Sequence, residues 1–304
     1  MLAEVLGVFA GADQGTFLDA TTGGAGHLSA ILSAHGALRA LGIDQDADAL
    51  AAAAEVLEAA GLSGRATLRH ARFDAVRDVV SKEGPGSLAG ALFDLGVSSH
   101  QFDVAGRGFS YRHDAPLDMR MDRRRALTAD TVVNTYDRDR LIAVLRDNAD
   151  ERFAARIVDA ILAARPVRTT GQLAEIVASA IPAPARRRGG NPAKRTFQAV
   201  RIEVNGELDI LAGALRDVIE LLAPGARLAV LSYHSGEDRI VKDVMRRAES
   251  GECRCPSGLP CGCGAVPMVR RVRAPRTASP GELERNPRAS SARLRVVEKI
   301  VPGS

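Results

Sequence analysis

A turn of small residues near the start of the chain has the composition of a ligand-binding loop. Residues 16–20 form a short apolar stretch typical of a buried strand, and residues 23–26 read Gly-Gly-Ala-Gly before a helical pattern begins at His27. Small side chains let the backbone approach a ligand closely. Open parallel sheets bind ligands where their strands end. We therefore expect a small-molecule site at this turn.

Three aspartates end three of the predicted strands: Asp19, Asp44 and Asp94. Asp44 follows Gly26 by 18 residues, where an acidic side chain can accept both ribose hydroxyls of an adenosine. A dinucleotide-binding enzyme shares this plan, but the spacing differs from G-x-G-x-x-G, and Asp19 suits a pyrophosphate badly. S-adenosylmethionine carries a sulfonium and an ammonium group, which carboxylates attract. The pattern favours a methyltransferase over a nucleotide-binding site or a purely structural turn.

The elements that must position these residues alternate between strands and helices. Helical patterns at 27–35 and 47–60 separate strand-like stretches at 16–20, 38–43, 66–73 and 88–93. This rhythm is typical of a parallel sheet covered by helices on both faces. Phe73, at the predicted end of the third strand, could pack on an adenine ring.

The middle of the chain follows a different pattern. Residues 106–201 show helices and loops without a convincing strand, including a capping-box pair formed by Thr169 and Gln172. A helix over 208–222, broken by Pro224-Gly225, and strands over 227–233 and 294–300 then resume the first pattern. The sequence predicts one discontinuous α/β domain (1–104 and 204–304) with an inserted helical domain (105–203).

Charge is concentrated in the predicted insert. Residues 105–203 carry 19 Lys and Arg against 12 Asp and Glu, whereas the remainder carries 22 against 25. A solvated surface explains such a segment as well as a nucleic-acid partner does. No apolar run approaches the roughly 18 residues that span a bilayer, and the N-terminus lacks the pattern of a signal peptide. We expect a soluble cytoplasmic protein without membrane contact.

Longer motifs run through nearly the whole chain. They are DLGVSSHQ (94–101), RGFS (107–110), PLDMRMD (116–122), ERF (151–153), PAKRTFQAVRI (192–202), VNGEL (204–208), HS (234–235) with EDRIVK (237–242), NPR (286–288) and SARLR (291–295). Together they resemble the bacterial family that methylates the exocyclic amine (N4) of a cytosine in the decoding centre of 16S ribosomal RNA. Strings of this length and number do not arise by chance.

The resemblance implies a class I Rossmann-like methyltransferase domain with an inserted helical, basic, substrate-recognition domain. It implies S-adenosylmethionine as methyl donor, cytosine 1402 as target, and 16S rRNA or the small ribosomal subunit as partner. It leaves the oligomeric state open, with a homodimer among the options. The cofactor contacts that it implies are Ala25, Gly26, His27, Asp44, Phe73, Asp94 and Gln101.

Catalysis of amine methylation needs a positioned nucleophile and an acceptor for its hydrogen bonds. Asp94 is the first candidate for that acceptor or for a cofactor contact, and Ser98 follows it on the same loop together with Ser99. His234 and Ser235 end a neighbouring strand; His234 is a catalytic candidate, with a loop-ordering hydrogen bond as the alternative. The aromatic candidates for stacking on an extruded base are Phe109, Tyr111 and Tyr233.

Three positions depart from the family pattern. Ala25 stands in place of glycine, Leu28 in place of serine and Gly236 in place of leucine. Alanine still permits a backbone contact with the cofactor, but a left-handed conformation at Ala25 would cost about 1 kcal/mol or more. The family usually has a short segment before the residues that match 2–6 of this chain, so we expect the chain to begin later than the family pattern does.

Two other functions compete with rRNA methylation. One is a small-subunit binding or assembly factor that binds the cofactor with little turnover. The other is a small-molecule or protein methyltransferase, which has no need of a basic platform of 100 residues. The basic side chains that could contact RNA phosphates are Arg123, Arg124, Arg125, Arg186, Arg187, Arg188, Lys194, Arg195, Arg270, Arg271, Arg273 and Arg276.

All the cysteines of the chain lie within 11 residues: Cys253, Cys255, Cys261 and Cys263. A secreted, disulfide-stapled domain would spread its cysteines through the fold. Four thiolates could bind one zinc ion, although C-x-C is a less typical spacing than C-x-x-C. We favour reduced surface thiols and predict no metal among the functional residues.

Overall fold

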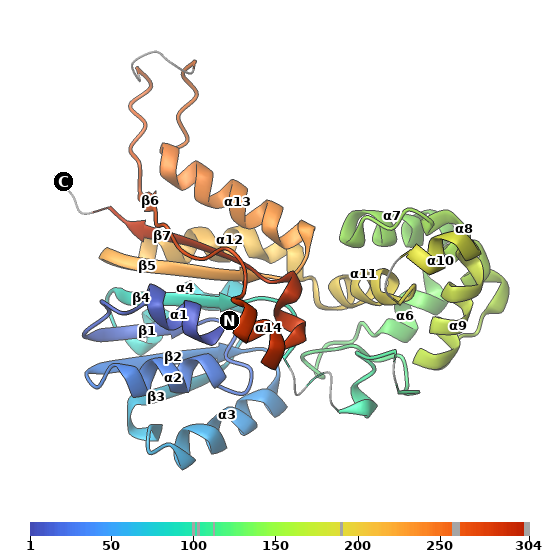
Figure 1. Cartoon of the computed structure of the whole chain (residues 1–304), viewed down its shortest axis with the longest axis horizontal. Helices are drawn as coiled ribbons and strands as arrows, with labels where there is room; N and C mark the ends of the chain where they lie inside the picture. The colour runs from blue at the N-terminus through green and yellow to red at the C-terminus, as the bar shows by residue number, and fades with distance from the viewer. Residues whose placement is uncertain (99–100, 102–103, 112, 189–190, 257–261, 301–304) are drawn as a thin grey trace. The chain divides into compact units, whose positions relative to one another are not determined.

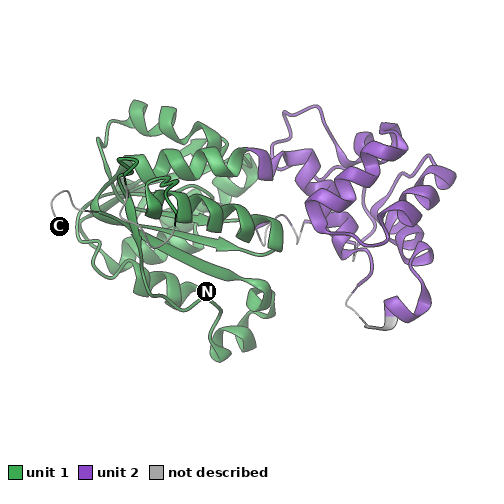
Figure 2. Cartoon of the chain, turned by 90° about the horizontal axis from the view of Figure 1, so that it is seen from above, with its two compact units in different colours: residues 1–96, 210–304 green, residues 97–209 purple. Residues whose placement is uncertain are grey.

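The chain divides into two compact units. The computed structural model describes residues 1–98, 101, 104–111, 113–188, 191–256 and 262–300. One unit comprises 1–96 and 210–304, and the other comprises 97–209 (Figure 2). These bounds differ by several residues from the predicted 105–203, and each unit is described by itself below.

The first unit is built on a seven-stranded sheet with the order β3-β2-β1-β4-β5-β7-β6 (Figure 1). The first five strands in this order are mutually parallel, and β7 is antiparallel to both β5 and β6. The α/β, Rossmann-like architecture predicted from the sequence is thereby confirmed. The strands are β1 (Gly15–Asp19), β2 (Leu38–Asp44), β3 (Ala66–His70), β4 (Leu88–Asp94), β5 (Leu222–Ser232), β6 (Val269–Arg271) and β7 (Arg293–Lys299).

Two apolar layers cover the faces of this sheet. Adjacent strand residues point to opposite faces, so Phe17 and Leu18 of β1 enter different core clusters. The Leu18 side carries residues of α4 (Val76–Glu83), α12 (Glu207–Leu221) and α13 (Ser235–Ser250). The Phe17 side carries those of α1 (Leu2–Val8), α2 (Gly26–Ala34) and α3 (Ala47–Ala59). A further short helix, α14 (Pro280–Arg285), lies near the chain's start, where Glu282 accepts from the terminal amine at 2.8 Å.

Two strands, β3 and β5, differ from the sequence prediction by more than one residue at an end. The third strand ends at His70, because its partner β2 ends at Asp44, and Phe73 therefore lies in a 3-10 turn (Phe73–Ala75) rather than on the strand. The helix before β5 ends at Leu221, earlier than predicted. Pro224-Gly225 falls within β5, at the point where the register between β5 and β4 shifts. Proline is tolerated at such an irregularity because it has no backbone N–H to donate to the neighbouring strand.

The second unit is helical. Its described helices are α6 (Ala129–Thr135), α7 (Arg138–Ala149), α8 (Ala154–Ala164), α9 (Thr170–Ala180), α10 (Ala183–Arg188) and α11 (Lys194–Asn205). The capping box of Thr169 and Gln172 at the start of α9 is confirmed. Within the described part of this unit, strand pairing is limited to an isolated bridge from Pro116 to Thr169.

Buried polar side chains tie the loop that precedes α6 to α11. Asn205 is fully buried; its Oδ1 accepts from the Met121 N–H at 2.9 Å, and its Nδ2 donates to the Met119 carbonyl at 2.9 Å. Arg107, also buried, donates to the carbonyl of Met121 at 3.1 Å. Among the described residues, none of the helices is both long and apolar enough to cross a membrane.

Candidate functional site

The loop between β1 and α2 is held at the carboxyl edge of the sheet by Thr22. Its hydroxyl donates to the carbonyls of Asp19 and Ile43 at 3.2 Å each, and its N–H donates to Ile43 at 3.0 Å. A Cβ on Gly42 would come within 2.7 Å of the Thr22 hydroxyl, so β2 needs glycine there. Thr22 thus fixes the loop across the ends of β1 and β2.

Asp44 binds the backbone on both sides of itself. One carboxylate oxygen accepts from the Gly23 N–H at 2.8 Å, and the other accepts from the Asp46 N–H at 2.9 Å. These backbone N–H groups fix the orientation of the carboxylate. The predicted strand-end aspartate is therefore pre-oriented toward the small-residue loop.

Asp94 connects three segments of the first unit. Its N–H donates to the Thr21 hydroxyl at 2.6 Å, and its Oδ1 accepts from the Tyr233 hydroxyl at 2.8 Å. His27 Nε2 lies 3.4 Å from Oδ2. The structure therefore brings together two predicted site residues, His27 and Asp94, with Tyr233, which the sequence offers only as a stacking candidate.

Electrostatics at this edge favour a cation. Burial raises the pKa of Asp19 to about 7; the charges of Asp94 and Asp44 also raise it, while His27 and the Thr21 N–H oppose the shift. Burial raises the pKa of Asp44 to about 6, although the N–H groups of Asp46 and Gly23 favour its charged form. Three carboxylates with insufficient positive charge between them are a site for a positively charged group.

His27 is tuned by the same carboxylates. Burial disfavours its charged form, but the contact with Asp94 and the charge of Asp19 outweigh it and raise the pKa of the imidazole. Its Nδ1 is buried and has no hydrogen-bond partner among the described residues. A polar ligand atom at this point would satisfy it.

The residues of this edge fit S-adenosylmethionine. The sulfonium and ammonium groups match the carboxylates Asp19 and Asp94, and the carboxylate of Asp44, at the end of β2, matches ribose hydroxyls. A Cβ at Gly24 or Gly26 would meet nothing within 4 Å, so the loop leaves room along its backbone.

Ala25 adopts the left-handed conformation that the family's glycine would favour. Its φ is 60° and its ψ 23°, and it forms the N-cap of α2. The Ala25 N–H donates to the Thr22 carbonyl at 2.8 Å, and the Ala25 carbonyl accepts from the Ser29 N–H at 2.8 Å. These bonds hold the alanine in a backbone conformation that costs about 1–2 kcal/mol for a residue with a Cβ.

Phe73, Ser98 and Gln101 are placed differently from the residues of the edge. Phe73 is buried and packs edge-on against Phe93, with ring centroids 5.8 Å apart. Ser98 and Gln101 belong to the helical unit, where the Ser98 N–H donates to Gln101 Oε1 at 3.0 Å. Ser99 lies outside the described residues, as does His100 of the same motif.

His234 caps α13. Its Nδ1 accepts from the Glu237 N–H at 3.4 Å, and its Nε2 lies 3.0 Å from Glu237 Oε1. The Glu237 carboxylate accepts hydrogen bonds from the N–H groups of Tyr233 and His234, at 2.7 and 3.3 Å. These bonds match the ordering role that the sequence leaves open as the alternative to catalysis, and they place Tyr233 beside Asp94. Ser235 is the first residue of α13.

The other two aromatic candidates lie in the helical unit. Phe109 is buried in its core, and the ring of Tyr111 packs edge-on against Phe197 at 5.6 Å. Tyr233 differs from both, because its hydroxyl contacts a site carboxylate. Burial and the charge of Asp94 raise the pKa of Tyr233, so its hydroxyl keeps its proton.

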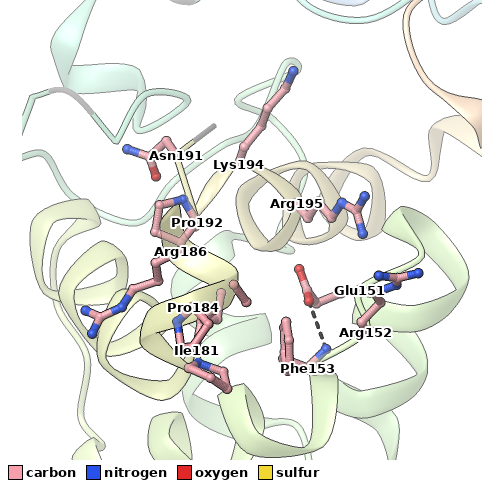
Figure 3. Close-up of a pocket in the computed structure, with 12 residues that line it drawn as sticks. Glu151, Arg152, Phe153, Ile181, Pro184, Arg186, Asn191, Pro192, Lys194 and Arg195 are labelled. Carbon is pink, nitrogen blue, oxygen red and sulfur yellow. Dashed lines mark hydrogen bonds between the residues drawn. The ribbon is translucent and has the colours of Figure 1, made fainter. Parts of the chain in front are cut away.

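A second feature is a cavity of about 630 Å³ within the helical unit (Figure 3). Its lining carries four cationic side chains, from Arg152, Arg186, Lys194 and Arg195, and the acidic side chain of Glu151. Glu151 accepts a hydrogen bond from the backbone N–H of Phe153 at 2.9 Å, which Figure 3 marks with a dashed line. The cavity therefore offers positive charge beside an aromatic ring.

Of the predicted basic side chains that the structure describes, all but Arg125 are exposed, and three of the exposed ones form ion pairs. Arg124 pairs with Asp122 at 2.8 Å, Arg270 with Glu298 at 2.5 Å and Arg271 with Glu249 at 2.8 Å. The other exposed side chains are those of Arg123, Arg186, Lys194, Arg195, Arg273 and Arg276. The side chains of Arg187 and Arg188 lie outside the described residues. Arg125 is half-buried and donates to the Asn205 carbonyl at 2.5 Å.

Sequence reasoning missed the residues that fix the site rather than bind a ligand. Thr21 and Thr22 bridge strand ends, and Gly42 makes room for Thr22. A threonine pair after Asp19 was visible in the sequence, but nothing in its spacing indicated which carbonyls it reaches. Glu237 had a signal, since it follows the cap position by three residues.

Comparison with known proteins identifies relatives along the full chain. The model of the MraW methylase family matches residues 1–300. A "Ribosomal RNA small subunit methyltransferase H" from Symbiobacterium thermophilum is 49% identical over 311 residues, covering 100% of this chain and 96% of that protein. A protein of the same name from Frankia casuarinae is 51% identical, covering 94% and 89%. A solved structure of an rRNA methylase from Streptococcus thermophilus is 12% identical, with a TM-score of 0.42, covering 98% and 93%.

Proposed function

The chain belongs to the MraW methylase family, and from this premise we propose that it methylates small-subunit ribosomal RNA. The methyl donor is S-adenosylmethionine, whose sulfonium supplies an activated methyl group. The finer proposal is that the acceptor is the exocyclic N4 amine of a cytosine in the decoding centre of 16S rRNA, cytosine 1402, as the sequence motifs imply.

The acidic edge of the sheet is the observation that carries this proposal. Asp19 is 1% exposed, and its pKa is raised to about 7. A buried carboxylate without a matching cation weakens a fold, so its presence favours a ligand that brings positive charge. Asp44, at the end of the adjacent strand, would hold the ribose, and the backbone from Ala25 to His27 would line the amino acid part.

Asp94 has the geometry of an acceptor for the target amine. A cytosine amine is a poor nucleophile, because its lone pair is delocalised into the ring, so orientation supplies much of the rate. Tyr233 and His27 each engage one Asp94 oxygen and leave a second acceptor position on each. Asp94 would hold the amine in line with the methyl group, and bulk water would take the proton that the product loses.

The remaining site residues are proposals that rest on the family resemblance. The 3-10 turn that begins at Phe73 would contact the adenine of the cofactor, and Gln101 would also contact the cofactor. Ser98 stays a catalytic candidate. For His234 we propose a positioning role, because its ring already contacts Glu237.

The helical unit would recognise the RNA. Exposed cations neutralise phosphates without reading sequence, and the cavity of the helical unit concentrates four of them. Its aromatic side chain, Phe153, can stack on a nucleobase. The partner we propose is 16S rRNA within the small subunit, and a reaction on ribosomal subunits places the enzyme in the cytoplasm.

The decisive experiment offers the protein three acceptors with methyl-labelled S-adenosylmethionine: unmodified 30S subunits, free rRNA and a protein extract. We expect label in 16S rRNA of the subunits, and nucleoside mass spectrometry should identify it as N4-methylcytidine. Asp94→Ala should abolish transfer. Asp139→Ala is the matched control, because that carboxylate is exposed and lies in the helical unit.

The same experiment separates the alternatives. Cofactor binding without transfer to any acceptor would support a small-subunit binding or assembly factor. Label in the protein extract alone would support a protein methyltransferase. Label at a different nucleoside of 16S rRNA would retain an rRNA methyltransferase and overturn the cytosine N4 assignment.

A further inference from the structure

Three cysteine sulfurs gather in the segment between α13 and β6. Cys253 and Cys255 lie on the arm that leaves α13, and Cys263 lies on the arm that returns to β6 (Figure 1). Their Sγ atoms all lie within 4.8 Å of one another. Cys261 lies outside the described residues.

The distances match a metal site better than a disulfide. The sulfurs of Cys253 and Cys263 are 3.7 Å apart, whereas a disulfide joins its sulfurs at about 2.05 Å. Zinc holds thiolates at about 2.3 Å in a tetrahedron, whose edge is then about 3.8 Å. The spacing of this pair is therefore the ligand-to-ligand distance of a tetrahedral zinc–thiolate centre.

The arms of this segment are joined at their base. Gly251 ends α13 with a φ of 61°, and a Cβ there would come within 2.6 Å of the backbone of Val266. The Met268 N–H donates to the Ala248 carbonyl at 2.8 Å. Close approach at the base brings the two arms together, so that cysteines on both can reach one ion.

Above that base, the described residues supply little packing. Val266 is 75% exposed, and residues 252–256 and 262–267 contribute no side chain to the buried clusters of the first unit. A segment of this length without a core is held in one conformation only by a cross-link or a bound ion. Among the described residues above the base, the convergence of three thiols is a feature that can order this segment.

We propose that Cys253, Cys255 and Cys263 are ligands of a structural zinc ion that joins the two arms. Thiolates are ligands that zinc prefers. Binding releases the thiol protons and leaves every bond between chain atoms unchanged. The ion would fix the segment that leads into β6, and it takes no part in methyl transfer.

Metal analysis of the full-length protein, purified under reducing conditions without chelator, tests the proposal. We expect about one zinc per chain, lost in Cys255→Ser and retained in the control Arg254→Ser, because Arg254 is exposed and lies between two of the ligands. Less than a tenth of a zinc per chain in the wild type, even after incubation with zinc, overturns the proposal. Iron in place of zinc overturns the assignment of the metal.

A thiol assay on the wild-type protein provides a second test, which does not depend on whether the Cys255→Ser variant folds. Because all cysteines of the chain lie between 253 and 263, a thiol reagent reads this segment alone. We expect slow modification in the native protein and a rise of at least tenfold in rate after a chelator is added, with trypsin cleavage after Arg254 accelerated in parallel. Equal rates with and without the chelator would contradict a bound ion.

Discussion

Asp19 offers the sharpest test of the acidic edge, because its raised pKa links cofactor binding to protons. In the free protein its pKa is about 7, against an ordinary value of 3.8. A sulfonium or ammonium group beside it would favour the charged form. The carboxyl should therefore release its proton when S-adenosylmethionine binds.

The size of this release follows from the two pKa values. At pH 6.5, a group with a pKa of about 7 is about three-quarters protonated, and one with a pKa of about 6 is about one-quarter protonated. Asp19 and Asp44 together would then release about one proton at pH 6.5 and about one-tenth of a proton at pH 8.

Calorimetric titration of the cofactor in buffers of different ionisation enthalpy measures the number of protons released. Asp19→Asn is the matched variant, since the amide oxygen can still accept from the Thr21 N–H. We expect the variant to lose about three-quarters of the release at pH 6.5 and to bind S-adenosylmethionine at least tenfold more weakly. Equal release in both proteins, or no decrease between pH 6.5 and pH 8, would refute this account of the edge.

The same substitution should stabilise the protein without its cofactor. A carboxyl whose pKa is raised on folding stabilises the fold below its unfolded pKa and loses that effect as pH rises through the folded pKa. For a shift from 3.8 to about 7, the loss is about 4 kcal/mol at pH 8. Asp19→Asn should therefore unfold at a higher denaturant concentration than the wild type at pH 8, and the difference should vanish near pH 4.

Three further predictions concern the rest of the structure. Asn205→Ala removes the side-chain hydrogen bonds to two buried backbone groups and should lower the free energy of unfolding of the helical unit by about 2–4 kcal/mol, measured by chemical denaturation; a loss below about 1 kcal/mol would contradict it. Tyr233→Phe removes the bond to a site carboxylate, worth about 1.5–3 kcal/mol, and should lower kcat about tenfold or more while cofactor affinity changes little; an unchanged kcat would show that the hydroxyl is dispensable. Lys194→Ala and Arg195→Ala should weaken RNA binding and each reduce the salt slope by about one, whereas the paired Arg138, changed to Ala, should not; equal slopes in all three would exclude the cavity as an RNA contact.

Much of the fold was predictable because the strands of a parallel sheet carry strong local signals. Apolar runs ending in aspartate gave β1, β2 and β4, and the ends of parallel strands meet at one edge whatever the details of packing. The strand bounds that failed depended on partners. β3 could extend no further than β2, and Pro224-Gly225 was accommodated within β5 by a shift in register against β4.

The division between the units could not be placed from pattern alone. The sequence pattern changes at 105 and 203, but the compact units meet at 97 and 209. Part of the reason lies in the first turn of α12, where Glu207 pairs with Arg201 of α11 at 2.9 Å. A helix that begins in one unit and continues in the other leaves no break in periodicity at the boundary.

The contacts that complete the site were equally hidden, because they join residues far apart in sequence. Tyr233 and Asp94 are 139 positions apart, and their hydrogen bond depends on how β4 and β5 pair. The capping of α13 by His234 was easier to predict from the sequence, because Glu237 lies only three positions after it. The contact between Tyr233 and Asp94 could be found only from the three-dimensional structure.

The residues that sequence reasoning did find are those that conflict with the fold around them. A position as buried as Asp19 would be occupied by an apolar or neutral side chain if stability alone decided it. Here three carboxylates lie at one edge, and two of them hold raised pKa values because burial, and the charges of nearby aspartates, oppose their own charge. A local choice that weakens the folded chain is explained when a ligand supplies the missing charge. The acidic edge was visible in the sequence for that reason, whereas Thr22 and Gly42, which only serve the fold, were not.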